Sequence, residues 1–281
     1  MRYSKRHKFI LISNWKCGCS TIAHFFQPYS EFGYDDQDKC KSRLKIPYNR
    51  IVHWPAYKVR AVLRRRENIT NWDDYITITT VRNPWARIVS MFFYIYKYTR
   101  DSETLKTRSH EQIKSDFTRF VTNELPKYKN GQRNRWTTEQ MIFDPRTKKR
   151  LVKYIVRLEH LQEDLEPIRL RHFPEFQPFN YDTKRNTTKH HHYSTYYNPK
   201  TRAIVKQMFL WDIRKFNYRF EKQSTQTTNE QNIDKSYIED QTCQKSTLNQ
   251  SSSSDETLES LTTSDLSKPS SPPIESSQSS S

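Results

Sequence analysis

Two short segments of the chain combine positive charge, hydroxyl groups and a position suited to binding phosphate. The first, residues 14–21, reads Asn-Trp-Lys-Cys-Gly-Cys-Ser-Thr and follows the apolar run at residues 8–13. Backbone amides at the start of a following helix, with the Lys16 ammonium beside them, would form a cradle for an anion. The lysine precedes the glycine and no Gly-Lys-Ser/Thr ending follows, so this is not a Walker A loop. A tight turn with a surface lysine is the alternative.

The second segment, residues 81–93, reads Val-Arg-Asn-Pro-Trp-Ala-Arg-Ile-Val-Ser-Met-Phe-Phe. Arg82 follows a predicted strand, and Ser90 lies two turns along the predicted helix. Arg87 and Ser90 are three residues apart and therefore share a helix face. An arginine at a strand end and a serine on the adjoining helix can bind a second phosphate at some distance from the first cradle. The alternative is that Arg82 and Arg87 are solvated basic residues.

Strands are predicted immediately before both segments. Residues 8–13 form a continuous apolar run, and residues 75–81 are rich in β-branched side chains. Both patterns are typical of buried strands, and residues 154–158 give a third. Because predicted strands alternate with predicted helices, the sequence indicates an α/β fold with a mainly parallel central sheet flanked by helices.

Helix starts are indicated by capping residues and by proline at the first helical position. The predicted helices begin at Thr21 with Ser20 as N-cap, at Pro84 after Asn83, at about Leu161, and at Pro199 after Asn198. The second should continue to about Tyr98. Residues 100–150 are polar and basic with little periodicity, and we expect irregular helices there that cover the sheet or shape an acceptor groove.

The two segments together resemble the sulfotransferases that use 3′-phosphoadenosine 5′-phosphosulfate (PAPS), in particular the carbohydrate, Golgi-type branch similar to sulfotransferase family 2. The family segment R-x-P-x-x-R-x-V-S-x-[FY] is matched by Arg82, Pro84, Arg87, Val89, Ser90 and Phe92. Residues 154–165, 184–197 and 212–218 are similar to later family segments, so the resemblance covers about residues 8–221. It implies a fold like that of the P-loop NTPases and sulfuryl transfer from PAPS to a hydroxyl of a carbohydrate.

The resemblance also implies a role for each matching residue. Lys16 would hold the transferring sulfate and its bridging oxygen, and Arg82 and Ser90 would bind the 3′-phosphate. The cradle for the 5′-phosphosulfate would come from Cys17, Gly18, Cys19, Ser20 and Thr21, and the nucleotide would be covered by Arg185, Thr187 and Lys189. The Cys-Gly-Cys insert departs from the family, where Ala-Cys or Ser-Gly is commoner. The resemblance therefore does not indicate which backbone amides face the phosphate.

Transfer also requires a base, because the acceptor hydroxyl loses its proton as sulfur is attacked. His53 lies between the two segments, where several family members carry the base, and the reference histidine pKa of about 6.5 suits the task. Glu159 and His24 are the other candidates, although Glu159 also fits a structural partner of an arginine. No metal is required, since Lys16 and a helix N-terminus can offset the developing charge.

Composition divides the chain into two regions. The net charge is +17, yet residues 222–281 hold nine acidic residues and only four lysines and are rich in Ser, Thr and Gln. That stretch cannot bury enough apolar surface to fold, so we predict a sulfotransferase domain at residues 1–221 and a disordered acidic tail at 222–281. The strongly basic domain implies a polyanionic partner and favours an anionic acceptor.

Other functions are less consistent with the sequence. A basic nucleic-acid- or polyanion-binding protein without catalysis is the main alternative, but no nucleic-acid-binding motif is present, and a nucleotide kinase lacks its Walker A loop. The spacing of Cys17 and Cys19 and the run His190–His192 fit no metal site, and we expect a solvated or anion-facing segment there. The chain contains no apolar stretch long enough to span a membrane and no export signal. Such a chain is expected in the cytoplasm, whereas the resemblance implies the Golgi lumen.

Overall fold

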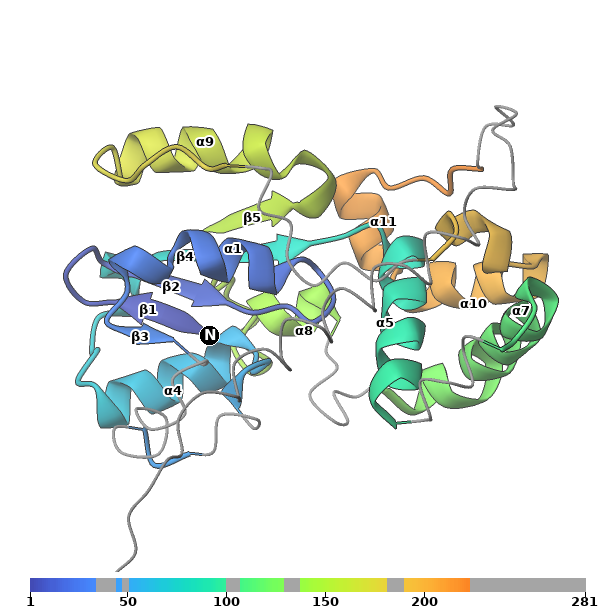
Figure 1. Cartoon of the computed structure of the whole chain (residues 1–281). Helices are drawn as coiled ribbons and strands as arrows, with labels where there is room; N and C mark the ends of the chain where they lie inside the picture. Colours follow the sequence, from blue (N-terminus) through green and yellow to red (C-terminus); the bar gives the residue numbers. More distant parts are fainter. Residues whose placement is uncertain (34–43, 47–50, 100–106, 129–136, 181–189, 223–281) are drawn as a thin grey trace, which may run out of the picture. The chain divides into compact units, whose positions relative to one another are not determined.

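The computed structural model describes residues 1–33, 44–46, 51–99, 107–128, 137–180 and 190–222 (Figure 1). Within these residues a five-stranded mixed sheet has the order β3-β1-β2-β4-β5. The strands are β1 (Arg2–Ser4), β2 (Phe9–Ile12), β3 (Phe32–Gly33), β4 (Ile76–Val81) and β5 (Tyr154–Arg157). Strands β2, β4 and β5 are parallel, whereas β1 is antiparallel to both of its neighbours. The predicted α/β fold is confirmed, with an antiparallel edge that the sequence did not reveal.

The register of the parallel strands brings the two phosphate-binding candidates to one edge of the sheet. Ile12, the last residue of β2, pairs with Thr79, and Val81 at the end of β4 pairs with Arg157. The Thr79 hydroxyl donates a hydrogen bond to the Ile12 carbonyl at 2.8 Å. The loop after β2 and Arg82 after β4 therefore leave neighbouring strands at their carboxyl ends, where open α/β sheets bind ligands.

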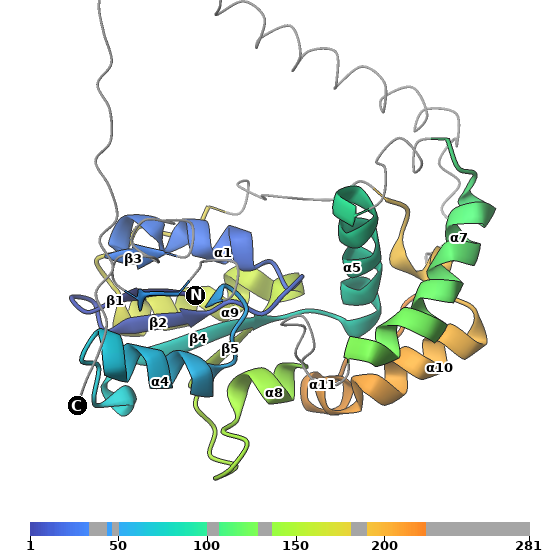
Figure 2. The same ribbon diagram turned by 90° about the horizontal axis from the view of Figure 1, so that it is seen from below.

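Helices flank the sheet and extend beyond its carboxyl edge (Figures 1 and 2). They are α1 (Cys19–Phe25), α4 (Ala56–Arg66), α5 (Pro84–Thr99), α7 (His110–Arg119), α8 (Thr138–Ile142), α9 (Leu161–His172), α10 (Pro199–Met208) and α11 (Leu210–Phe216). Single turns of 3₁₀ helix lie at Gln27–Tyr29, Trp72–Asp74, Leu125–Tyr128, Leu158–His160 and Tyr193–Tyr196, and a π turn lies at Phe120–Glu124. Residues 107–128 and 137–150 thus contain the irregular helices expected there.

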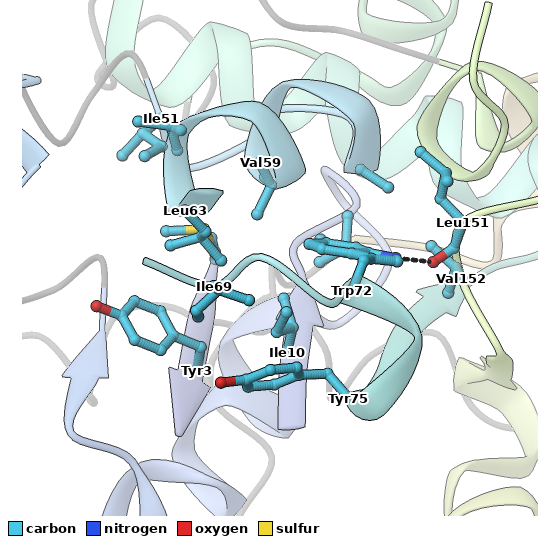
Figure 3. Close-up of a cluster of buried hydrophobic side chains, with 14 of the residues drawn as sticks. Tyr3, Ile10, Ile51, Val59, Leu63, Ile69, Trp72, Tyr75, Leu151 and Val152 are labelled. Atoms are coloured by element: carbon cyan, nitrogen blue, oxygen red, sulfur yellow. Dashed lines mark hydrogen bonds between the residues drawn. The ribbon is translucent and has the colours of Figure 1, made fainter. Parts of the chain in front are cut away.

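Strand β2 is buried on both faces, which explains its uninterrupted apolar sequence. Phe9 and Leu11 belong to the cluster under α1 and α9, whereas Ile10 and Ile12 belong to the cluster under α4. Figure 3 shows part of this second cluster, with the indole N–H of Trp72 donating to the Leu151 carbonyl at 2.8 Å. The layers on both faces hold β2, and therefore the loop that follows it, in a fixed position.

A third apolar cluster lies beyond the carboxyl ends of the strands. Helix α5 continues from β4 and packs against α10, and both contribute to a cluster that includes Phe92, Phe117, Tyr196 and Val205 (Figure 2). The Phe92 ring lies 5.4 Å from the Phe117 ring, edge to face. This cluster fixes the direction in which α5 leaves the sheet, and so positions the residues on its exposed side.

The helix starts agree with the sequence at three sites and differ at one. Helix α9 begins at Leu161, as predicted. The Asn83 side chain accepts from the Trp85 amide at 3.1 Å, and Asn198 accepts from Thr201, so both predicted caps are confirmed. Helix α1, however, begins at Cys19, and its N-cap is Gly18 rather than Ser20.

The carboxyl-terminal elements of the domain also differ in detail from the expectation. The stretch from Pro199 to Phe216 forms two helices with a break at Phe209. The predicted tail lies outside the described residues from residue 223 onward. None of the helices within the described ranges is long and apolar enough to cross a membrane.

Candidate active site

The loop after β2 is held by a buried asparagine. The Asn14 side-chain amide donates to the Thr80 carbonyl at 3.1 Å and to the Thr138 hydroxyl at 3.3 Å. Its oxygen accepts from Arg87 Nη2 at 3.0 Å, and Arg87 Nε donates to the Trp15 carbonyl at 3.1 Å. Arg87 is buried, so the reading of this residue as a solvated base is wrong. It joins α5 to the loop after β2, a function that its position in the sequence did not reveal.

Gly18 starts helix α1 in a conformation that favours glycine. Its φ is 74°, in the left-handed region, and a Cβ built there would lie 2.3 Å from Leu158 Cδ1. The amides of Cys19 and Ser20 precede the first hydrogen bonds of the helix and donate to no acceptor in the described part of the chain. These two amides are therefore available to an anion.

The two cysteines of the loop can offer an anion their backbone amides but no charge from their side chains. Cys17 is buried, and burial raises the pKa of its thiol to about 12. Burial also raises the pKa of Cys19. Both thiols are neutral at pH 7, which favours an anion nearby because a thiolate would repel it. Thr21 is buried in the first turn of α1, and Ser20 beside it is partly exposed.

Lys16 lies on the loop between Trp15 and Cys17 with a backbone φ of 60°, a conformation that non-glycine residues rarely adopt. Its Nζ lies 4.3 Å from the centroid of the Tyr94 ring on α5. Residues in this region of backbone space persist where the surrounding structure holds them, and they concentrate at functional sites. The position of Lys16 is thus set by the loop backbone and by a ring on a neighbouring helix.

Arg82 follows β4 directly and is partly buried. Burial lowers the pKa of its guanidinium, but an arginine keeps its charge at neutral pH. Within the described ranges Arg82 forms no hydrogen bond or ion pair. The same is true of the side chain of Ser90, a buried residue on α5. The Glu159 carboxylate attracts Arg82 electrostatically, but a partly buried charge without a hydrogen-bonded partner is costly, so an anionic ligand for Arg82 is expected.

Glu159 anchors the start of α5. Its Oε1 accepts from the Asn83 amide at 2.6 Å, and its Oε2 accepts from the Tyr218 hydroxyl at 3.1 Å. Both carboxylate oxygens are therefore engaged, and the structural interpretation of this residue is the better one. Its hydrogen-bond partners are an amide and a hydroxyl, and its charge also attracts Arg82, in line with the expected arginine partner.

His53 has one ring nitrogen directed at the loop. Its Nδ1 lies 3.0 Å from the Ser13 carbonyl, so Nδ1 carries a proton, and Nε2 of the neutral ring is an acceptor. Burial lowers the pKa of His53 to about 4, well below the reference value used above. The ring also meets Trp15 edge to face at 6.3 Å. His53 is thus neutral at pH 7 and able to accept a proton.

The other predicted residues are more remote or cannot be placed. His24 lies in the last turn of α1, at the opposite end of the helix from Gly18, where its Nδ1 pairs with Gln27 Oε1 at 3.2 Å. Arg185, Thr187 and Lys189 lie outside the described residues.

The histidine segment was expected to be either solvated or anion-facing, and the first alternative is wrong for His190, which is half-buried. This ring stacks on Phe93 of α5 at 5.1 Å, and burial lowers its pKa. In the portion of the chain that the structure describes, no three His, Cys, Asp or Glu side chains are grouped to hold a metal ion.

The comparison with known families identifies the chain's class. The sulfotransferase family model matches residues 1–219, which include every strand and helix described above. The chain belongs to the sulfotransferase family. No curated protein and no solved structure matches it. The sulfotransferase therefore carries the loop after β2, Arg82 and Ser90 within the matched region, and its general activity is sulfuryl transfer.

A buried carboxyl group of the sulfotransferase is linked through Thr138 to the loop after β2. Asp212 on α11 is 2% exposed, and burial raises the pKa of its carboxyl to about 6. It hydrogen-bonds with Thr138, which also binds Asn14 of the loop. The folded protein holds the Asp212 proton more tightly than the unfolded chain, so this group's contribution to stability falls as pH rises from about 4 to 6. Burial of His53 has the opposite effect, because its folded pKa is the lower one.

We therefore expect Asp212→Asn to remove the loss of stability that Asp212 causes as pH rises. The free energy of unfolding of the variant should rise with pH between about 4 and 6 more steeply than that of the wild type, by up to about 1.4 kcal/mol per pH unit. Urea denaturation at fixed pH values measures the slope, and every group shared by the two proteins cancels in the difference. Parallel profiles for the two proteins would contradict this assignment.

Proposed function

We propose that this sulfotransferase transfers a sulfuryl group from PAPS to a hydroxyl of a carbohydrate acceptor. The observation that carries the proposal is Arg82, a partly buried cation without a hydrogen bond or ion pair in the described ranges. It follows the strand next to the one that leads into a loop with two available amides. Two anion-binding positions on neighbouring strand ends suit a ligand with phosphate groups at both its 3′ and 5′ positions. A ligand with one phosphate would leave one of them unused.

Each residue then has a defined part in the transfer. PAPS supplies the sulfuryl group, and 3′-phosphoadenosine 5′-phosphate leaves. The amides of Cys19 and Ser20 and the Lys16 ammonium stabilise negative charge on the phosphosulfate, and Arg82 with Ser90 holds the 3′-phosphate. The acceptor oxygen forms a bond to sulfur as the bond from sulfur to the bridging oxygen breaks. The acceptor proton passes to Nε2 of His53.

The acceptor is proposed from charge. A net charge of +17 on a chain with an acidic carboxyl-terminal region favours an anionic substrate such as a sulfated or uronate-containing glycan. We assign the activity to residues 1–221, and the end of the family match at residue 219 is consistent with that boundary. Residues 222–281 have no assigned part in the reaction.

Two measurements on the full chain test the proposal. Calorimetric titration should detect binding of 3′-phosphoadenosine 5′-phosphate, and labelled PAPS should then transfer sulfate to an anionic glycan better than to a tyrosine peptide or a small alcohol. Transfer only to the peptide or alcohol would overturn the acceptor assignment. Failure of both the nucleotide and PAPS to bind, together with tight binding of nucleic acid, would favour the non-catalytic polyanion-binding alternative.

Arg82→Ala is expected to weaken PAPS binding about tenfold or more. A hydrogen-bonded charge on phosphate is worth about 1.5 to 3 kcal/mol, and the variant loses it entirely. Arg157→Ala is the matched control, because Arg157 ends the neighbouring strand but is already paired with Asp164 at 2.7 Å. Its affinity should stay within about twofold of wild type. Equal wild-type affinity for PAPS and for a cofactor without the 3′-phosphate would sink the assignment of Arg82.

A further inference from the structure

One face of α5 contacts the loop after β2 at two positions, Arg87 and Tyr94. Arg87, Ser90 and Tyr94 are spaced three and four residues apart and so form one stripe along the helix. Arg87 binds the Trp15 carbonyl, while the Tyr94 ring meets the Trp15 indole edge to face at 5.6 Å and the Lys16 ammonium at 4.3 Å. The proposed 3′-phosphate ligand Ser90 lies between these two contacts along the helix.

Tyr94 is not placed as a core residue would be. It is 37% exposed, whereas Phe92 and Phe93 before it are buried in the cluster of α5 and α10. Its ring faces Lys16 and Trp15, and His53 lies on Trp15 as well. The exposed tyrosine thus lies at the edge of the apolar cluster, next to residues to which the transfer chemistry is assigned.

We propose that Tyr94 is the positioning residue of Lys16, and this inference rests on the proposed function. A lysine side chain has four rotatable bonds, and a cation over an aromatic face loses that freedom at little cost because the ring attracts the ammonium. The left-handed backbone of Lys16 fixes the base of the side chain, and the Tyr94 ring restrains its end. The ammonium is therefore held charged and close to the loop before the phosphosulfate arrives, which lowers the cost of orienting it during transfer.

Turnover of ring variants tests this role. Tyr94→Leu should lower kcat about three- to thirtyfold, the range expected for loss of a cation–π contact, with affinity for 3′-phosphoadenosine 5′-phosphate within about twofold of wild type. That nucleotide lacks the sulfuryl group that Lys16 contacts, so its binding should not depend on Tyr94. Tyr94→Phe keeps the ring and should retain kcat within about twofold. Equal losses in the Phe and Leu variants would overturn the proposal.

A double-mutant cycle tests whether Tyr94 acts through Lys16. In a Lys16→Ala background, Tyr94→Leu should lower kcat by no more than about twofold further, because the partner is already absent. The same loss in both backgrounds would show that Tyr94 acts independently of Lys16. Lys8→Ala is the matched control. Lys8 also has a positive φ, 53°, and lies 5.1 Å from a tyrosine ring, but it precedes β2 at the opposite end of the strand from the loop. Its kcat should stay within about twofold of wild type.

The contact can also be measured without any turnover. Urea denaturation of the ligand-free wild type, both single variants and the double variant should give a coupling of about two- to fivefold in the unfolding constant. No coupling would overturn the proposal whether or not the enzyme is active. Coupling in a wild-type protein that transfers nothing from PAPS would leave the contact established and refute the proposed function alone.

Discussion

The Lys16→Ala variant should transfer sulfate about 10² to 10³ times more slowly than the wild type, the loss typical of removing one preorganised group that stabilises transition-state charge. Negative charge builds on the sulfuryl oxygens and on the leaving bridging oxygen as transfer proceeds, and the ammonium is the mobile cation of this loop. Affinity for PAPS should fall less than turnover does, because the amides of Cys19 and Ser20 and the Arg82 guanidinium remain.

Single-turnover kinetics and calorimetry separate the two effects for Lys16. Circular dichroism should show that the variant keeps its fold, because Lys16 belongs to none of the apolar clusters and alanine is no more strained than lysine at this positive φ. Lys16→Arg retains charge but not the compact shape of the ammonium and should recover part of the loss. If Lys16→Ala retains turnover within about threefold of wild type, the charge on the leaving oxygen is stabilised by other groups.

The sequence could predict those features of the fold that depend on neighbouring residues. The apolar run at β2 and the β-branched run at β4 identified two buried strands, and Asn83 with Pro84 identified the start of α5 to the residue. Strands β1 and β3 have three and two residues, too few for any periodicity, and their pairing depends on contacts distant in sequence.

The N-cap of α1 shows why a local signal can fail. Serine is a favoured N-cap, so Ser20 was the expected choice, but the loop after β2 has to turn sharply over Leu158. Only glycine accommodates both that close approach and the positive φ, so the helix begins two residues earlier than the serine predicts. The constraint comes from the strand β5 region, more than a hundred residues away along the chain.

The candidate site was predictable in its residue types and much less so in its contacts. Family-like spacing selected Lys16, Arg82 and Ser90, and the structure brings their elements to one sheet edge. The shared helix face of Arg87 and Ser90 was predicted from their spacing, whereas Tyr94 on the same face was not singled out. The partners of Arg87 are buried polar groups that only the tertiary packing reveals. The same holds for the pKa of His53, which burial moves away from its reference value.

The lowered pKa of His53 predicts a specific dependence of kcat/KM on pH. If His53 accepts the acceptor proton, kcat/KM should be nearly level from about pH 5 to 7 and should fall as pH drops through about 4, where the ring becomes protonated. A limb near pH 6.5, the reference value, would contradict the assignment of the acceptor proton to the buried His53 ring.

His53→Asn should lower turnover by about 10² to 10⁴ while leaving affinity for 3′-phosphoadenosine 5′-phosphate within about twofold. The asparagine amide can still donate to the Ser13 carbonyl, as Nδ1 does, but it has no counterpart of Nε2, so the variant removes the base and keeps the contact. The fall near pH 4 should disappear along with the activity.

His24→Asn is the control, because that ring lies at the far end of α1, and the turnover of this variant should stay within about twofold of wild type. A folded His53→Asn protein with turnover within about threefold of wild type would place the base elsewhere. With both Glu159 oxygens occupied and His24 remote, the half-buried His190 on Phe93 would be the next histidine to replace.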